Sequence, residues 1–410
     1  MTFIRCLACL LLLALAACVR TPPRVDRNTP TLLLVSIDGY RADYLDRGLS
    51  PTLAALAADG VRARYMRPSF PSLTFPNHYT LVTGLRPDRN GIVANIMEDE
   101  RIPGERFSAT NRTAVGNPRW WDEATPLWTS VQRSGRRAAT MFWPGSEAPV
   151  QGRHPDYWAH YDRDVADDVR VDAVLGWLDL PVAERPSFIT LYFDRVDVVG
   201  HHFGPDSAQT DEALRSVDAA LARLVAGLDA RGLRDRINLV IVSDHGMVAT
   251  SRQRVVLLDD IMPRGYFRIV MAGVLTGIAP RPEYREEVEA ALLAPHAHMQ
   301  CHRRDAMPAR FHYGTNRRIP PILCLADNGW VIGDRDLLAR KSSFSLGEHG
   351  YDIDDPQMRA IFVGRGPGLR RKAVIAPFDN VDVYPLLARL LGITPEPGDG
   401  DLSHVREALR

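Results

Sequence analysis

Short apolar runs separated by helical patterns constrain the fold of this 410-residue chain more than any other feature. The runs have the length of strands, and their consecutive apolar residues leave no polar face. They cover residues 31–37, 137–142, 187–193, 238–242 and 359–363. Strands that are apolar on both faces are typical of parallel sheets with helices on either side. We therefore expect an α/β fold with a mainly parallel central sheet flanked by helices on both faces.

The segments between these runs contain residues that are typical of helix starts and ends. Ser50 and Pro51 offer an N-cap and a first-turn proline, and Gly60 marks the end of that helix. Further helices are expected over 206–231 and 381–391. Residues 255–345 break the alternation with proline-rich turns and one short helix over 282–293. We expect a large domain over 31–410, with 255–345 as an inserted cap subdomain.

The overall charge balance argues against one class of function. The 50 basic and 50 acidic residues cancel, so the chain lacks the bulk positive charge that drives nucleic-acid binding. We expect no sequence-specific nucleic-acid binding.

The N-terminus has the pattern of an export signal. Residues 6–17 are almost wholly apolar, follow Arg5, and are too few to span a bilayer. The ending Leu15-Ala16-Ala17-Cys18 resembles a bacterial lipobox, whose cysteine carries lipid in the mature protein. We expect a signal peptide over 1–18, a tether over 19–30, and a lipid-anchored protein of the bacterial periplasm. An ordinary cleaved signal and a buried helix are the alternatives.

Two cysteines, Cys301 and Cys324, remain beyond the signal and Cys18. In an exported chain two cysteines favour one disulfide. Two unpaired buried thiols are the alternative, because spacing alone does not fix the geometry.

Acidic and histidine residues follow three of the apolar runs. In open α/β sheets, ligands bind beyond the carboxyl ends of the strands, so these residues should converge. They are Asp38 after the first run, Asp194, Asp197 and His201 after the third, and Asp244 and His245 after the fourth. Oxygen and nitrogen ligands without thiolates favour a catalytic zinc ion or a similar divalent metal.

Several motifs give the chain a family resemblance. PSLTFPNHYTLVTG at 71–84 and NGIVAN at 90–95 resemble the nucleophile segment of the nucleotide pyrophosphatase/phosphodiesterases, in the alkaline phosphatase superfamily. SIDGYR at 36–41, DVVGHHFGP at 197–205, SDHGM at 243–247 and GEHGYD at 347–352 match in family order. One departure is Arg195-Val196-Asp197, where the family usually has Glu-Pro-Asp.

The resemblance implies two Zn²⁺ ions per chain. Asp38, Asp244 and His245 would hold one beside Thr74, and Asp197, His201 and His349 would hold the other. Metal coordination turns a threonine hydroxyl into a nucleophile, and two metals can clamp the attacking and leaving oxygens at phosphorus. His201 rather than its neighbour His202 is expected as the ligand, because it lies one helical turn from Asp197.

The resemblance also implies residues that bind substrate. Asn95 would donate to a phosphate oxygen, and Phe75 and Tyr161 would stack on a nucleotide base. Trp143 and Glu147 are expected to line the same pocket. The implied activity is hydrolysis of nucleotide diesters or pyrophosphates to nucleoside monophosphates, through a phospho-threonyl intermediate on Thr74.

Other readings of these residues remain open. Thr74 could cap its helix, and Tyr161 could serve only packing. His296, His298, Cys301 and His302 are spaced like metal ligands. A zinc-finger site needs a second, matching pair of ligands, which the sequence lacks. Competing functions are a phospholipid or choline phosphodiesterase, an alkaline-phosphatase-like monoesterase, and a surface-binding lipoprotein without activity.

Overall fold

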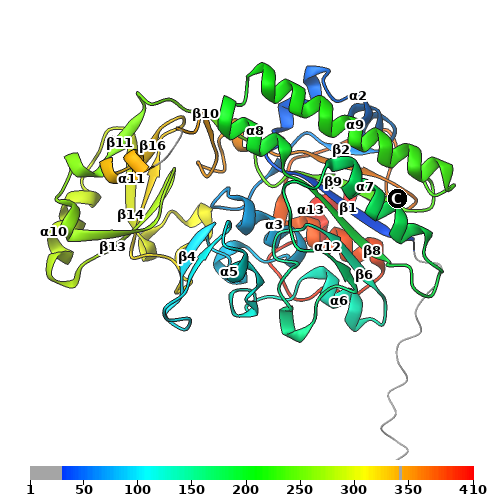
Figure 1. Ribbon diagram of the computed structural model, residues 1–410, viewed down its shortest axis with the longest axis horizontal. Helices are drawn as coiled ribbons and strands as arrows, with labels where there is room; N and C mark the ends of the chain where they lie inside the picture. Colours follow the sequence, from blue (N-terminus) through cyan, green and yellow to red (C-terminus); the bar gives the residue numbers. More distant parts are fainter. Residues whose placement is uncertain (1–29, 341–343) are drawn as a thin grey trace, which may run out of the picture.

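The computed structural model describes residues 30–340 and 344–410, and an eight-stranded sheet forms its centre (Figure 1). The strand order is β19-β2-β18-β9-β1-β8-β6-β7. Five neighbouring strands run parallel: β9 (Asn238–Val242), β1 (Leu32–Ile37), β8 (Phe188–Phe193), β6 (Ala138–Met141) and β7 (Tyr157–Trp158). The expected mainly parallel sheet is confirmed.

One expected strand differs in its direction. The run over 359–363 forms β18 (Phe362–Arg365), which pairs antiparallel with β9 and with β2 (Val61–Ala63). β19 (Ala373–Ile375) then pairs parallel with β2 at the edge. An apolar run indicates a buried strand but carries no information about which way it runs.

Helices cover both faces of this sheet because successive side chains of β1 point to opposite faces. Leu33, Val35 and Ile37 pack in one core with α2 (Pro51–Asp59), α7 (Asp167–Asp179) and α9 (Ala208–Ala230). Leu32 and Leu34 pack in another core with α3 (Thr74–Thr83), α6 (Leu127–Arg133) and α12 (Val383–Leu391). Figure 1 shows α2, α7 and α9 together on one side of the strands.

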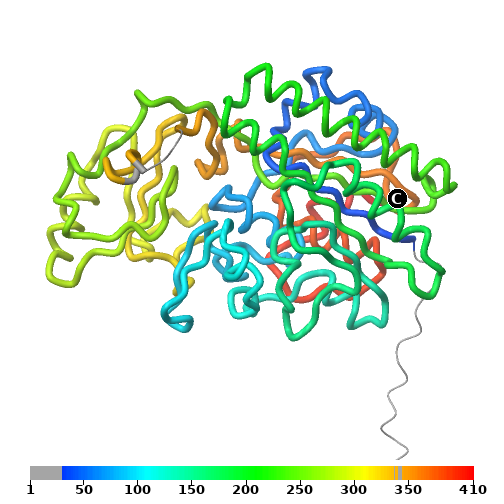
Figure 2. The backbone as a smooth tube through the Cα atoms, viewed as in Figure 1, coloured from blue at the N-terminus to red at the C-terminus, as the bar shows by residue number. Residues whose placement is uncertain are grey.

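A second, antiparallel sheet stands beside the main one (Figure 2). Its order is β12 (Phe267–Met271), β13 (Leu275–Pro280), β15 (Ile322–Ala326) and β14 (Met299–Arg303). Together with α10 (Arg285–Leu293) it builds a separate core that includes Phe267, Ile278 and Val288. The boundaries of the expected cap, 255–345, stay a prediction.

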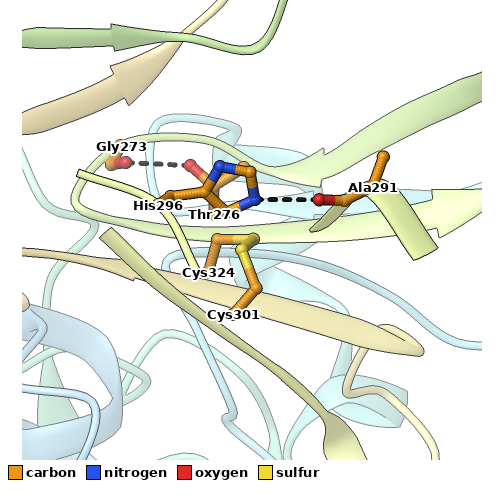
Figure 3. The surroundings of a disulfide bond; sticks show 6 residues. All are labelled: Gly273, Thr276, Ala291, His296, Cys301 and Cys324. Carbon is orange, nitrogen blue, oxygen red and sulfur yellow. Dashed lines mark hydrogen bonds between the residues drawn. A yellow bond between two sulfur atoms is a disulfide. The ribbon is translucent and has the colours of Figure 1, made fainter. Parts of the chain in front are cut away.

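The two cysteines lie opposite each other in this second sheet (Figure 3). Cys301 of β14 and Cys324 of β15 form a disulfide with their Cα atoms 4.0 Å apart. The nearby His296 donates from Nε2 to the carbonyl of Ala291, and His298 stacks on Trp330 with ring centroids 3.6 Å apart. The metal-like spacing of this stretch therefore does not correspond to a metal cluster.

The expected signal peptide, with Cys18, and the tether up to residue 29 lie outside the described residues. Among the helices of 30–340 and 344–410, none combines the length and apolar character needed to cross a bilayer. The described chain enters β1 at the end of the sheet away from the second sheet (Figure 1).

Candidate active site

Three adjacent strands deliver the candidate ligands to one edge of the main sheet, called here the catalytic edge. Asp38 directly follows β1, and Asp244 and His245 are the second and third residues after β9. After β8 the chain forms α8 (Arg195–Phe203), which carries Asp197 and His201 one turn apart. Because β1 lies between β8 and β9, the carboxyl ends of the three strands meet.

A distant segment brings the last candidate ligand. β17 (Gly347–Glu348) pairs antiparallel with β10 (Val248–Ala249), which follows His245 closely in the chain. This pairing places His349 against His245, with ring centroids 3.6 Å apart and planes 12° from parallel.

The ligand atoms gather in two overlapping groups. Asp38, Asp244 and His245 form one, and Asp197, His245 and His349 form the other, each with its ligand atoms within 4.8 Å of one another. His201 stands slightly apart, with Nε2 3.5 Å from Oδ2 of Asp197. The geometry thus brings all six predicted side chains together, but places His245 close to both groups rather than one.

Backbone carbonyls fix the tautomer of the three histidines. Nδ1 of His201, His245 and His349 lies 2.6, 2.9 and 2.9 Å from the carbonyl oxygens of Gly347, Gly246 and Ser72. A carbonyl only accepts, so Nδ1 carries a proton in each ring, and Nε2, which faces the carboxylates, is the nitrogen that would bind a metal once unprotonated. Neutral imidazoles in this orientation are what a metal site requires.

The carboxylates show why a cation fits here. Oδ1 of Asp38, Oδ1 of Asp197 and Oδ2 of Asp244 are buried and have no hydrogen-bond partner within the described residues. Burial, together with the charges of Asp244 and Asp197, raises the pKa of Asp38 well above its ordinary range. A divalent metal would satisfy these oxygens and offset their mutual repulsion, so the residues present fit one.

Gly39 allows the turn after β1 to lie close to Asp197 of α8. Its φ of +67° lies in the left-handed region, and a Cβ there would come within 3.1 Å of the Cα of Asp197. A larger residue at this turn would separate Asp38 from the α8 ligands.

Thr74 is the first residue of α3 and faces this cluster. Its side chain does not cap the helix, whose N-cap is Leu73, and its Oγ1 lies 3.3 Å from Nε2 of His245. The helix covers residues 74–83, so Thr74 belongs to its first turn. The nucleophile candidate and the metal-ligand candidates therefore share one location.

Two residues that sequence reasoning did not assign to the ligand set support it from behind. Tyr192 donates its hydroxyl to Oδ2 of Asp38 at 2.6 Å. His78 of α3 lies with Nδ1 2.9 Å from the carbonyl of Thr74 and 3.4 Å from Oδ2 of Asp244. Such partners hold ligands in a fixed orientation.

The predicted substrate-binding residues surround Thr74 in different ways. Oδ1 of Asn95 accepts from the backbone N–H of Phe75 at 3.0 Å, which leaves the Asn95 amide nitrogen available to donate to a ligand. Phe75 packs against Phe107 and Trp121, with its side chain largely buried.

Tyr161 is half-buried and packs edge-on against Phe142. Trp143 is fully buried, and its indole donates to the carbonyl of His78, so its place in the pocket stays a prediction. Glu147 is buried as well and pairs with Arg112 and His160.

Comparison with known proteins decides the family. The family model described as "Type I phosphodiesterase / nucleotide pyrophosphatase" matches residues 32–352. The chain belongs to this family. As a member of it, the protein is a hydrolase of phosphodiester and pyrophosphate bonds.

Relatives of this family resemble most of the chain. An uncharacterized pyrophosphatase/phosphodiesterase of Schizosaccharomyces pombe is 35% identical over 381 residues, covering 90% of this chain and 78% of that protein. The mouse bis(5'-adenosyl)-triphosphatase is 36% identical and covers 93% of this chain and 82% of its own. Some relatives are longer, and the chain spans only 45% of mouse ectonucleotide pyrophosphatase/phosphodiesterase family member 3.

A solved structure of the same family shares the fold. Murine ectonucleotide pyrophosphatase/phosphodiesterase 5, an inactive threonine-to-alanine variant in complex with AMP, has a TM-score of 0.88 and 32% identity. The match covers 93% of this chain and 100% of that one.

Proposed function

We propose that this family member hydrolyses nucleotide diesters or pyrophosphates to nucleoside monophosphates through a covalent phospho-threonyl intermediate. The observation that carries the proposal is the position of Thr74, whose Oγ1 lies 3.3 Å from Nε2 of His245, beside the carboxylates of Asp38 and Asp244. The inactive threonine-to-alanine relative with AMP and the bis(5'-adenosyl)-triphosphatase relative support the nucleotide substrate class.

The proposed cofactor is a pair of Zn²⁺ ions. One would be held by Asp38, Asp244 and His245 beside Thr74, and the other by Asp197, His201 and His349. When bound, such ions favour the alkoxide form of a hydroxyl and offset charge on the attacking and leaving oxygens at phosphorus.

The side chains then have separate tasks. Oγ of Thr74 forms a bond to phosphorus as the bond to the leaving oxygen breaks, and water later cleaves the Thr74 ester. The Asn95 amide nitrogen donates to a phosphate oxygen, while its own oxygen is held by Phe75. Phe75 and Tyr161 hold the base, because aromatic faces accept any flat heterocycle.

A substrate panel tests this proposal. The purified protein is assayed on p-nitrophenyl-TMP, diadenosine triphosphate, p-nitrophenyl phosphate and lysophosphatidylcholine. We expect the highest kcat/KM on the two nucleotide substrates. Faster hydrolysis of the lysophospholipid would replace the nucleotide with a choline phosphodiester, and preference for the monoester would refute diesterase function.

The nucleophile is tested by Thr74→Ala. We expect loss of turnover with retained fold and metal content, because the candidate ligands other than Thr74 remain. Circular dichroism and elemental analysis are the controls for fold and metals. Wild-type turnover in this variant would refute the covalent intermediate.

We also propose that the protein is exported and anchored to the membrane of the bacterial periplasm through lipid on Cys18. The support is the lipobox-like ending of the N-terminal apolar run, Leu15-Ala16-Ala17-Cys18.

A further inference from the structure

A buried arginine lies among the apolar side chains of α7. Arg170 is 2% exposed and lies on the same side of the helix as the buried Val174 and Leu178. A cation on an apolar helix face costs free energy unless all its donors are used, so its partners show what it organises.

Arg170 joins two segments of the chain near the catalytic edge. Its Nε donates to the carbonyl of Val165 at 2.9 Å, in the segment that follows Tyr161. Its Nη1 donates to the carbonyl of Tyr192 at 3.1 Å and to Oδ1 of Asp194 at 2.8 Å, at the end of β8. The guanidinium therefore fastens the segment 161–165 to the strand that precedes the α8 ligands.

Asp194 completes this connection. The structure directs it away from the two groups of ligand atoms, although it follows the same strand as Asp197. Its Oδ2 accepts the hydroxyl of Tyr161 at 2.6 Å, while Oδ1 accepts from Arg170. The carboxylate is 6% exposed, so its charge is held mainly by these two partners.

The ring of Tyr161 is also fixed at its side. Phe142 packs edge-on against it with centroids 5.5 Å apart, and the Arg170 guanidinium lies 5.2 Å from the Phe142 ring centroid. Phe142 has a φ of +64°, a conformation that a bulky residue adopts only where its surroundings hold it. The Tyr161 ring is thus restrained at its hydroxyl end by Asp194 and at its side by Phe142, and the Arg112 guanidinium lies over the ring, 5.3 Å from its centroid.

We propose that Asp194 and Arg170 are positioning residues that hold the Tyr161 ring as a preformed wall for the nucleotide base. The inference rests on the proposed function, since it assumes that Tyr161 contacts the base. Restraint before binding saves the cost of ordering the ring when substrate arrives. The pair therefore acts on substrate binding and on the choice between base-bearing and base-free esters, rather than on the chemical step.

The test distinguishes the contribution of the Tyr161 hydroxyl from that of its aromatic ring. In Tyr161→Phe, the ring remains and the hydrogen bond to Asp194 is lost. We expect KM for p-nitrophenyl-TMP to rise about 2- to 12-fold, the effect of freeing one side chain at a binding site, with kcat retained. The base-free ester bis-p-nitrophenyl phosphate should show no change in KM.

Tyr157→Phe is the matched control. Tyr157 belongs to β7 and donates its hydroxyl to the backbone carbonyl of Glu184 at 3.1 Å, so Tyr157→Phe likewise removes one hydroxyl and its hydrogen bond and keeps the ring. We expect wild-type kinetics from it on both esters.

Asp194→Asn provides the second arm, and the double variant with Tyr161→Phe tests their coupling. The double variant should raise KM no further than Tyr161→Phe alone, because residue 194 acts on the ring through the Tyr161 hydroxyl, which Tyr161→Phe has already removed. Where Asp194→Asn fails to fold, Tyr161→Phe decides the question by itself.

The outcomes distinguish this inference from the proposed function. A normal KM in Tyr161→Phe with a raised KM in Tyr161→Ala would overturn the positioning role and leave base stacking in place. A normal KM in both would remove Tyr161 from the site and overturn the inference, whereas diester hydrolysis that depends on Thr74 would still stand.

Discussion

Adjacent histidines on α8 have different surroundings. Nε2 of His201 faces Asp197 at 3.5 Å and its Nδ1 is held by Gly347, whereas His202 is exposed beside Phe203. One residue along a helix rotates a side chain by about 100°, so only one of the two can face the cluster.

His201→Ala should therefore lose metal, and His202→Ala should not. We expect elemental analysis of purified protein to fall from two metals per chain to about one in His201→Ala, because a three-ligand site retains little affinity with two. His202→Ala is the matched control on the same helix. Two metals retained in His201→Ala would remove this histidine from the ligand set.

The sequence predicts these site residues to different extents. Asp38, Asp244 and His245 could be placed because each lies within three residues of the end of a buried apolar strand, and such strand ends meet. Asp194 and Asp197 follow the same strand, and only the geometry of α8 separates a residue that holds Tyr161 from one that faces the metal groups. Arg170 did leave a signal, since it interrupts an apolar stripe with Val174 and Leu178.

At the scale of elements, α2 begins differently from the expectation. Ser50 is the N-cap position as predicted, but its hydroxyl accepts from Tyr40 instead of capping the helix. Asp218 of α9 takes that role, accepting from the backbone N–H groups of Thr52 at 3.0 Å and Leu53 at 2.9 Å. The local sequence located the start of α2. It did not show that Asp218 accepts the first-turn N–H groups, because Asp218 lies far along the chain.

Asp218→Ala should destabilise the fold. The buried carboxylate satisfies two orphan donors at a helix N-terminus, so its loss should cost about 1–2 kcal/mol of unfolding free energy. Urea denaturation followed by circular dichroism measures the change. Asp229→Ala is the control, because Asp229 of the same helix makes only an exposed pair with Arg234. Equal midpoints for the two variants would contradict the capping role.

The second sheet was not predicted strand by strand, for a physical reason. β13 and β15 pack against a small core of their own, and prolines bound their runs, since Pro280 ends β13 and Pro320 and Pro321 directly precede β15. Short runs of this kind do not distinguish a strand from a loop. β1 and β8 of the main sheet have the same length as β13 but are almost continuously apolar, and they carry a stronger signal.

At the scale of the whole molecule, the hairpin of β4 (Ile96–Glu98) and β5 (Arg106–Ser108) connects the site with the second sheet. Glu98 accepts from Arg268 at 2.5 Å, and Arg106 donates to the carbonyl of Val270 at 2.8 Å. Asn95 directly precedes β4, so a substrate-binding candidate lies at the base of this connection.

The export proposal also belongs to this scale. Expressed in a bacterial host, the full chain should incorporate labelled palmitate and sediment with membranes, and Cys18→Ser should do neither. Cys9→Ser, within the same apolar run, should keep the label. Absence of label on the wild-type protein would refute the lipid anchor.

The direction of β1 has a practical consequence. The described chain enters at Leu32 and reaches Asp38 only after the full strand, about 20 Å further along at the rise of a parallel strand. Whatever is attached ahead of Leu32 therefore joins the molecule at the opposite side from Thr74. Coupled to a bead or a sensor chip through residues ahead of Leu32, the protein would be attached at the end of β1 opposite to the catalytic edge, which suits it to oriented immobilisation and continuous-flow assays.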